Sequence, residues 1–229
     1  HKHRRPPMEY KDLLGGKGAN LAEMTSVLKL PVPPGFTIST DACRDYMYGG
    51  WPELLDEEIA KHVFKLEKAM GRKLGDPFDP LLVSVRSGAK FSMPGMMDTV
   101  LNLGLNDQSV EGLAHSTDDE RFAYDSYRRF IAMYGRIVLG VDGEPFEHAL
   151  DAAKEKAGTA MDNLIPADAL KELCEDYKAI VLKETGAHFP QKPREQLNGA
   201  VEAVFKSWNG ARAIAYRNRE KIDHDLGTA

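Results

Sequence analysis

The sequence contains almost no cysteine, with Cys43 and Cys174 as the only two among 229 residues. They lie far apart, and neither belongs to a CxxC motif or to a Cys/His cluster of the kind that binds metal. Two isolated cysteines are typical of a protein in a reducing compartment. We therefore expect a cytoplasmic protein in which packing is the role of both thiols.

Long apolar runs and an excess of one charge are also absent. No run approaches the roughly 20 apolar residues of a membrane span, and no signal or transit peptide is recognisable. The chain has 30 Lys and Arg against 35 Asp and Glu, a formal net charge of −5. This balance argues against nonspecific binding of nucleic acid, although it leaves room for one local basic site. We expect neither a membrane nor a nucleic acid as partner.

Familiar catalytic patterns are missing as well. The seven histidines are scattered, and no two are three or four residues apart on a helix face, so they form no metal-binding pattern. No Ser/His/Asp or Cys/His arrangement is supported by spacing, and the Walker A pattern GxxxxGK[ST] does not occur. Any chemistry must therefore come from less familiar motifs.

The first hundred residues mix helix and strand signals. The apolar residues that follow Gly18 have helical spacing until "LPVPPG" ends the helix. "GFTISTDA" alternates like a half-buried strand, and Asp41 is placed to cap a short helix that reaches Tyr48. A longer helix is expected after Pro52. The basic opening "HKHRRPP", residues 1–7, is typical of a disordered start or a cloning remnant.

Two further segments have the character of strands. "PLLVSVRSG" is a nearly all-apolar run that ends in a charge, as in a buried strand that places a residue at the rim of a sheet. "VLNLGLND" predicts a second strand after the loop "SMPGMMDT". Only three or four strands can be identified, whereas a sheet usually has about five or six. The predicted sheet is therefore incomplete.

The rest of the chain is helical. Apolar stripes predict three helices between about Gln108 and Ile180, and a long final helix is expected from Pro193 to Ile222. The fold class is accordingly α/β or α+β: an α/β lobe over 8–106, a helical subdomain inserted over 107–190, and a helix over 191–229 that returns to the lobe.

The stretch "DLLGGKGANLAEM" places Lys17 among Gly15, Gly16 and Gly18, just before a helix. Glycines before a helix N-terminus expose backbone N–H groups and the positive end of the helix dipole, which together attract anions. A lysine adds a compact positive charge suited to phosphate. The alternative is an exposed lysine in an ordinary turn, and the motif alone does not decide between the two.

Arg86 ends the apolar run "PLLVSVR". An unpaired charge at a sheet edge is unfavourable, so Arg86 needs a partner, and its planar guanidinium is suited to phosphate oxygens. The alternative is a structural salt bridge with a carboxylate.

The segment "SGAKFSMPGMMDT" follows directly. Ser87 and Gly88 could donate hydrogen bonds to an anion, and the methionines, beginning with Met93, form a soft apolar surface suited to an adenine ring or to a domain contact. A methionine cluster also fits an ordinary core. Asp98 could assist a metal or cap the turn.

Taken together, "LLGGKGANLAEMTSVLKLPVPPGFTISTDAC", "DPLLVSVRSGAKFSMPGMMDTVLNLGLND" and "VFKSWNGARAIAYR" closely resemble the pyruvate phosphate dikinase family. The resemblance covers nearly the whole chain after residue 7. It implies the first lobe of an ATP-grasp nucleotide-binding domain, an incomplete mixed sheet with flanking helices and a helical insertion.

The resemblance also implies ATP-binding residues: Lys17, Arg86, Gly16, Gly18, Ser87, Gly88, Met93 and Asp98. Lys17 is similar to the ATP-phosphate lysine of the family and Arg86 to its strand-end arginine. This chain has Lys90 where the family often has a second arginine.

The family transfers the β-phosphoryl group of ATP through a phosphohistidine to pyruvate, giving phosphoenolpyruvate, AMP and pyrophosphate, with phosphate as co-substrate and Mg²⁺ as cofactor. The resemblance implies that the magnesium ligands, the phosphohistidine and a dimer-forming barrel lie outside this chain, which we expect to be inactive alone. The expected location is the cytoplasm; a plastid is the alternative if the protein comes from a plant, although no transit peptide is seen. Alternatives are a phosphoenolpyruvate synthase, a glucan, water dikinase, or a noncatalytic nucleotide-binding or interaction module.

Overall fold

The computed structural model describes residues 5–229. The first four residues of the predicted disordered start therefore lie outside the described residues. The chain divides into two compact units. The first unit contains residues up to Gly71, Arg86–Thr99 and Val201–Ala229; the second contains Arg72–Val85 and Val100–Ala200.

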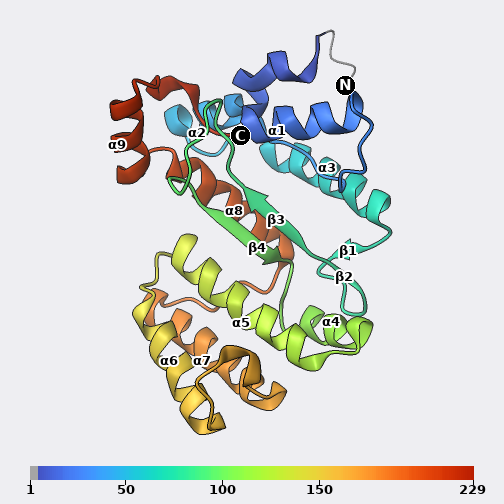
Figure 1. Cartoon of the computed structure of the whole chain (residues 1–229), viewed down its shortest axis with the longest axis vertical. Helices are drawn as coiled ribbons and strands as arrows, with labels where there is room; N and C mark the ends of the chain where they lie inside the picture. The colour runs from blue at the N-terminus through green and yellow to red at the C-terminus, as the bar shows by residue number, and fades with distance from the viewer. Residues whose placement is uncertain (1–4) are drawn as a thin grey trace. The chain divides into compact units, whose positions relative to one another are not determined.

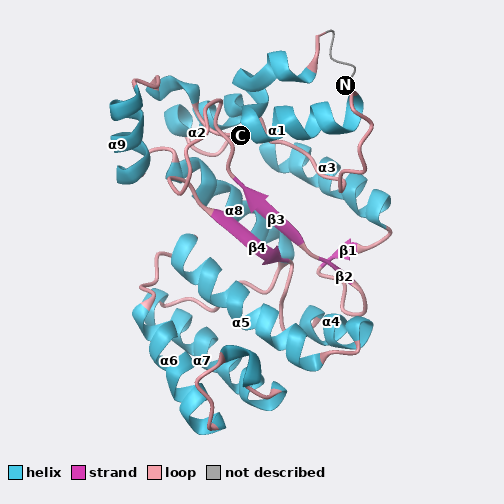
Figure 2. Cartoon of the chain, viewed as in Figure 1, coloured by secondary structure: helices cyan, strands magenta, loops and turns pink. Residues whose placement is uncertain are grey.

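Helices dominate both units, and strands are few and short (Figures 1 and 2). The elements of the first 103 residues are η1 (Pro7–Tyr10), α1 (Lys11–Ser26), α2 (Thr40–Gly49), α3 (Leu55–Met70), β1 (Lys73–Leu74), β2 (Pro80–Leu81), β3 (Val83–Arg86) and β4 (Thr99–Leu103). They are followed by α4 (Ser109–Thr117), α5 (Glu120–Ile137), α6 (Glu144–Ala157), η2 (Asp162–Leu164), α7 (Ala167–Thr185), α8 (Pro193–Ser207), α9 (Ala211–Glu220) and η3 (His224–Leu226).

The strand predicted in "GFTISTDA" is wrong. Residues 28–39 form no strand, and the chain enters α2 at Thr40. Alternating side chains make a strand only if a neighbouring strand pairs with its backbone, and no such neighbour lies beside this segment among the described residues. Asp41 does not cap α2 either, because Ser39 is the N-cap residue and the Asp41 carboxylate pairs with Arg44.

The single long helix predicted for 193–222 is also wrong, because it is broken into α8 and α9. Trp208, Asn209 and Gly210 form a tight turn between them, with their amides bonded three residues back. The Trp208 side chain is fully buried, and the guanidinium of Arg217 from α9 lies 4.0 Å from its ring centroid. Arg217 also donates to the Trp208 carbonyl, so side-chain contacts fold α9 back onto the break.

The predicted helical block between 108 and 180 is confirmed. In the second unit, α5 packs against α4 and α7, and α6 packs against α7 (Figure 1). Phe130 and Tyr134 of α5 pack against Phe189 in the segment after α7, and the three rings meet edge to face with centroids 5.6–5.7 Å apart. These rings are almost completely buried.

The two later strand predictions are confirmed, although the strands are shorter than their apolar runs. β1 pairs in parallel with β2, and β3 pairs with β4, giving two two-stranded sheets. β3 alternates between half-buried and exposed residues instead of being buried throughout. The chain is thus a mixed α/β protein with small sheets and many helices.

Both cysteines are buried, as predicted: Cys43 is fully inaccessible and Cys174 is 1% exposed. Burial raises the pKa of Cys174 to about 12. Among the residues that the structure describes, no helix is long and apolar enough to cross a membrane.

A charged network in the second unit holds the turn at Asp162 against its helices. Arg128, only 5% exposed, donates to the carboxylates of Asp125 and Asp162, and Lys154 Nζ lies 2.9 Å from Asp162 Oδ1. The pKa of the Asp162 carboxyl lies below its ordinary value. The hydrogen bond from Lys154 lowers it most, and the Arg128 guanidinium lowers it further.

This network predicts a pH dependence. A carboxyl whose pKa is lowered by folding stabilises the protein above its unfolded pKa, near 3.8, and this stabilisation is lost as pH falls through the lower folded value. Asp162→Asn should therefore lower the melting temperature by about 2 °C at pH 7, and the difference from wild type should shrink below pH 4. Thermal unfolding across pH 3–7 measures this. The control is Glu155→Gln, because Glu155 is exposed and forms no ion pair among the described residues. Its melting temperature should equal that of wild type at every pH.

Candidate functional site

The glycine turn lies between two helical segments that together make up α1. Gly15 has the non-helical angles φ 64° and ψ 169°, so the first segment, which begins at Lys11, ends at this kink and the predicted helix follows it. Lys17 therefore lies in the first turn after the kink. A Cβ atom at Gly15 would lie 1.9 Å from the carbonyl oxygen of Gly88, so only glycine permits this approach of two backbones.

Backbone hydrogen bonds hold the segment Ser87–Ala89 on both sides. Gly16 N donates to Ala89 O at 2.8 Å. On the other side, Gly88 and Ala229 exchange bonds of 2.8 and 2.9 Å, and Thr228 Oγ1 also accepts from Gly88 N at 3.2 Å. Ser87, Gly88 and Ala89 are buried as a result.

The Lys17 side chain crosses this segment. A Cβ atom at Gly88 would lie 3.3 Å from Lys17 Cβ, so the lysine stem lies directly on the Gly88 backbone. Lys17 Nζ donates to Ser87 O at 2.7 Å. The residue is otherwise exposed. Its ammonium group is thus fixed beside the end of β3, with donor capacity left over.

Arg86 is the last residue of β3 and is exposed. Within residues 5–229 it forms no ion pair, so the structural salt bridge considered as an alternative is not found. Two effects lower the pKa of Lys17. The larger is partial desolvation of its ammonium group, and the smaller is electrostatic repulsion by the Arg86 guanidinium. Lys17 is thus bonded to the residue that directly follows Arg86, and neither cation has a carboxylate partner among residues 5–229.

Lys90 differs from both. Its Nζ atom lies 2.5 Å from Asp12 Oδ1, and Asp12 is itself fixed through its carbonyl, which accepts from the buried Thr40 hydroxyl at 2.6 Å. Sequence reasoning missed Asp12, although it opens the quoted glycine stretch. The carboxylate neutralises Lys90, so the positive charge left for an anion is that of Lys17 and Arg86.

The remaining predicted residues are placed as follows. The amides of Gly16 and Gly88 are engaged within the protein, and a Cβ atom at Gly18 would lie 2.9 Å from Thr37 Oγ1. Met93 is 6% exposed and Asp98 is half-buried; both lie in the loop after Ser87, and no described contact joins either to Lys17 or Arg86. The structure thus brings Lys17, Arg86, Gly16, Ser87 and Gly88 together.

Sequence reasoning also missed a contact that holds the loop. Tyr216 of α9 donates to Ser92 O at 3.4 Å. No cluster of three His, Cys, Asp or Glu side chains in the described part of the chain is arranged to hold a metal ion.

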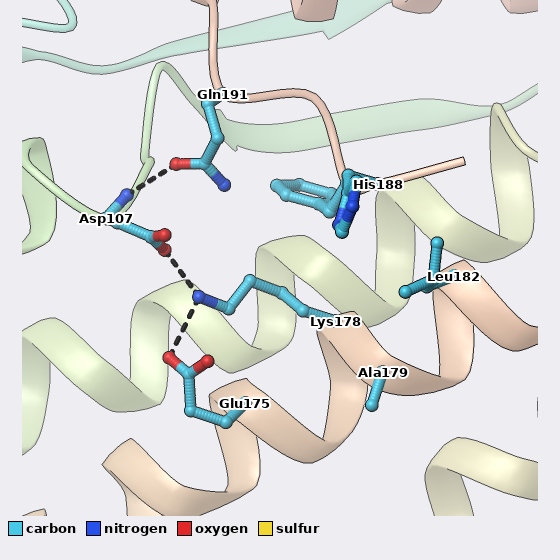
Figure 3. Close-up of a pocket in the computed structure, with 8 residues that line it drawn as sticks. Asp107, Glu175, Lys178, Ala179, Leu182, His188 and Gln191 are labelled. Atoms are coloured by element: carbon cyan, nitrogen blue, oxygen red, sulfur yellow. Dashed lines mark hydrogen bonds and ion pairs between the residues drawn. The ribbon is translucent and has the colours of Figure 1, made fainter.

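A cavity of about 330 Å³ in the second unit offers a contrast. Its charged groups satisfy one another (Figure 3): Lys178 Nζ lies 2.7 Å from Asp107 Oδ1 and 2.8 Å from Glu175 Oε1, and Asp107 N donates to Gln191 Oε1. Lys178, Asp107 and Glu175 thus neutralise one another at this cavity, unlike Lys17 and Arg86.

The contact between Gly15 and Gly88 predicts a large effect of one methyl group. Gly15→Ala should destabilise the protein by about 2–4 kcal/mol, because the new Cβ atom collides with backbone and the residue keeps a positive φ. Gly35→Ala is the matched control, since a Cβ atom there meets nothing within 4 Å. Urea unfolding compares the two variants, and equal midpoints would contradict the close approach.

Comparison with known proteins places this geometry in a family. Residues 11–50 and 50–229 match the family described as pyruvate phosphate dikinase, AMP/ATP-binding domain. The chain is 55% identical over 220 residues to the pyruvate, phosphate dikinase of Giardia intestinalis and 55% over 225 residues to that of Clostridium symbiosum. It is 54% identical over 221 residues to the chloroplastic pyruvate, phosphate dikinase 1 of Arabidopsis thaliana.

Each of these alignments covers 96% of this chain but only 23–25% of the relative. The chain thus spans about a quarter of the length of the relatives it matches. With this identity over nearly all of its residues, the chain belongs to the pyruvate phosphate dikinase family, in which it matches the AMP/ATP-binding domain.

Proposed function

We propose that this chain binds the phosphates of ATP through Lys17 and Arg86, as the first lobe of an ATP-grasp domain in a pyruvate phosphate dikinase. The observation that carries the proposal is the pair of neighbouring cations with no carboxylate partner. The family description, which names an AMP/ATP-binding domain, supports the choice of anion.

The physical argument rests on charge. Like charges held close together repel each other, and an anion between them turns the repulsion into attraction. The Arg86 guanidinium can bind two phosphate oxygens at once, while the Lys17 ammonium acts as a point charge. Because Ser87 O orients Lys17 Nζ, the Lys17 side chain loses little entropy on binding.

The amides of Gly16 and Gly88 are bonded within the protein, so we assign these glycines to the close packing of the turn rather than to direct contact with phosphate. Gly18, Ser87, Met93 and Asp98 stay predicted contacts of the nucleotide. The predicted boundaries of the α/β lobe, the helical insertion and the returning helix likewise stay predictions.

In the whole protein we propose the reaction of the named relatives: ATP, phosphate and pyruvate are interconverted with AMP, pyrophosphate and phosphoenolpyruvate through a phosphohistidine outside this chain. Lys17 and Arg86 would hold the phosphates and stabilise the charge that develops on them. Mg²⁺ would add positive charge at the same phosphates, with ligands that the family resemblance places outside this chain. Dimerisation would likewise depend on other domains.

The anion site can be tested on this chain directly. Mg-ATP should bind weakly, with a dissociation constant of about 10⁻⁴ M or weaker, because one lobe leaves most of the nucleotide in water. Lys17→Met and Arg86→Gln should each weaken binding at least about tenfold, the loss expected for a charge-assisted hydrogen bond. Two-dimensional NMR titration measures this through the amide signals of residues 16–18 and 86–89.

Two controls separate specific contacts from net charge. Lys65→Gln removes an exposed charge of α3 without disturbing any ion pair of the described residues, and the double variant Asp12→Asn/Lys90→Gln removes a neutral pair. Both should bind within about twofold of wild type. If Lys17→Met and Arg86→Gln bind no worse than these controls, the proposed site is wrong.

The role in catalysis is tested in a full-length homologous enzyme that carries the same residues. Arg86→Leu should slow phosphorylation of the enzyme by ATP on the order of a hundredfold, because a preorganised charge at the phosphates is lost. Exchange of the phosphoryl group between phosphoenolpyruvate and the histidine should continue, since it does not use this site. A parallel loss of both half-reactions, with a lower melting temperature, would make Arg86 structural.

A further inference from the structure

Lys17 differs from several other lysines of the chain in what lies around its amine. Lys90, Lys154 and Lys178 pair with carboxylates at 2.5–2.9 Å. A hydrogen bond to the Asp162 carboxylate is the largest cause that raises the pKa of Lys154. A hydrogen bond to the Glu172 carboxylate does the same for Lys156. Lys17 bonds to a neutral carbonyl instead.

This environment disfavours the charged form of the amine relative to an ordinary lysine. Desolvation and the adjacent guanidinium lower the pKa of Lys17, and a lysine beside another cation is a known route to a nucleophilic amine. The side chain is exposed to solvent, and its position is fixed by Gly88 and Ser87. A reagent in solution can therefore reach an oriented amine whose pKa is lowered from its ordinary value.

Arg86 adds selectivity for the charge of the reagent. Its exposed guanidinium has no ion pair among residues 5–229, and it lies next to Ser87, the residue to which Lys17 is bonded. A small reagent with a phosphate group would be held by Arg86 while its electrophilic carbon faces the lysine. The anion-attracting group and the nucleophile are thus adjacent.

From this geometry we infer that Lys17 is a site of acylation by acyl phosphates, with Arg86 holding the phosphate group of the donor. The neutral Lys17 amine attacks the acyl carbon, the bond from that carbon to the phosphate oxygen breaks, and phosphate leaves with the electron pair. The amine proton passes to phosphate or water, and an amide replaces the ammonium. Acylation removes the positive charge of Lys17, so the site attracts anions less strongly.

The inference goes beyond ATP binding and does not depend on it, since it requires only that the pair attracts a phosphate group. Selective acylation without nucleotide binding would contradict the proposed function alone. Nucleotide binding at Lys17 without selective acylation would contradict this inference alone.

The test uses acetyl phosphate on the 229-residue chain at neutral pH, with acetylation at each lysine quantified by peptide mass spectrometry. Acetylation of Lys17 should exceed that of the exposed reference Lys65 at least about tenfold, the lower end of the range for electrostatic enrichment of an anion. Inorganic phosphate in excess should protect Lys17 and leave Lys65 unchanged.

A neutral reagent separates binding from intrinsic reactivity. N-hydroxysuccinimide acetate also acetylates lysines but has no phosphate for Arg86 to hold. A change in the reactivity of the Lys17 amine affects both reagents and cancels in the ratio of acetyl-phosphate labelling to ester labelling. Loss of the phosphate contact affects acetyl phosphate alone. The ratio at Lys17 should therefore fall several-fold in Arg86→Gln. The double variant Asp12→Asn/Lys90→Gln should keep the wild-type ratio.

Melting curves confirm that each variant is folded before labelling. Lys17 acetylation equal to that of Lys65 would overturn the inference. So would a labelling ratio that is unchanged in Arg86→Gln.

Discussion

The close approach of two backbones at Gly15 and Gly88 is the constraint on which the candidate site depends. With a Cβ position at Gly15 only 1.9 Å from Gly88 O, no other residue fits without moving the chain. The contact lets Gly16 N reach Ala89 O and places the Lys17 stem on Gly88. The glycines of "GGKG" thus act mainly through packing, since the amides of Gly16 and Gly88 bond within the protein.

Charge pairing distinguishes this site from the charged clusters of the second unit. In the second unit, charged groups near the helices occur in satisfied networks, such as Arg128 with Asp125 and Asp162, or Lys178 with Asp107 and Glu175. In the first unit, Lys90 has Asp12. Lys17 and Arg86 form no ion pair within residues 5–229, and an uncompensated pair of cations is more informative about a ligand than any number of surface ion pairs.

The loop that follows β3 is held from several directions. Gly16 contacts it from α1, Tyr216 from α9, and Thr228 with Ala229 from the end of the first unit. These contacts come from segments far apart in the sequence. A loop fixed in this way holds Ser87 O in place as the hydrogen-bond acceptor of Lys17 Nζ, directly after Arg86.

The sequence by itself determined the helices of the second unit, because helical periodicity is local and the apolar stripes of α5 and α7 already specify which faces are buried. It also singled out Lys17 and Arg86, since a glycine turn and a strand end are visible in a few neighbouring residues. The tertiary structure decided what depends on distant partners. "GFTISTDA" forms no strand because no neighbouring strand pairs with it, and α9 packs on Trp208 through Arg217. Asp12 forms an ion pair with Lys90, whereas Arg86 forms no ion pair within residues 5–229. Pairing of strands and of charges joins residues far apart in the chain or on separate elements, so local pattern cannot specify it.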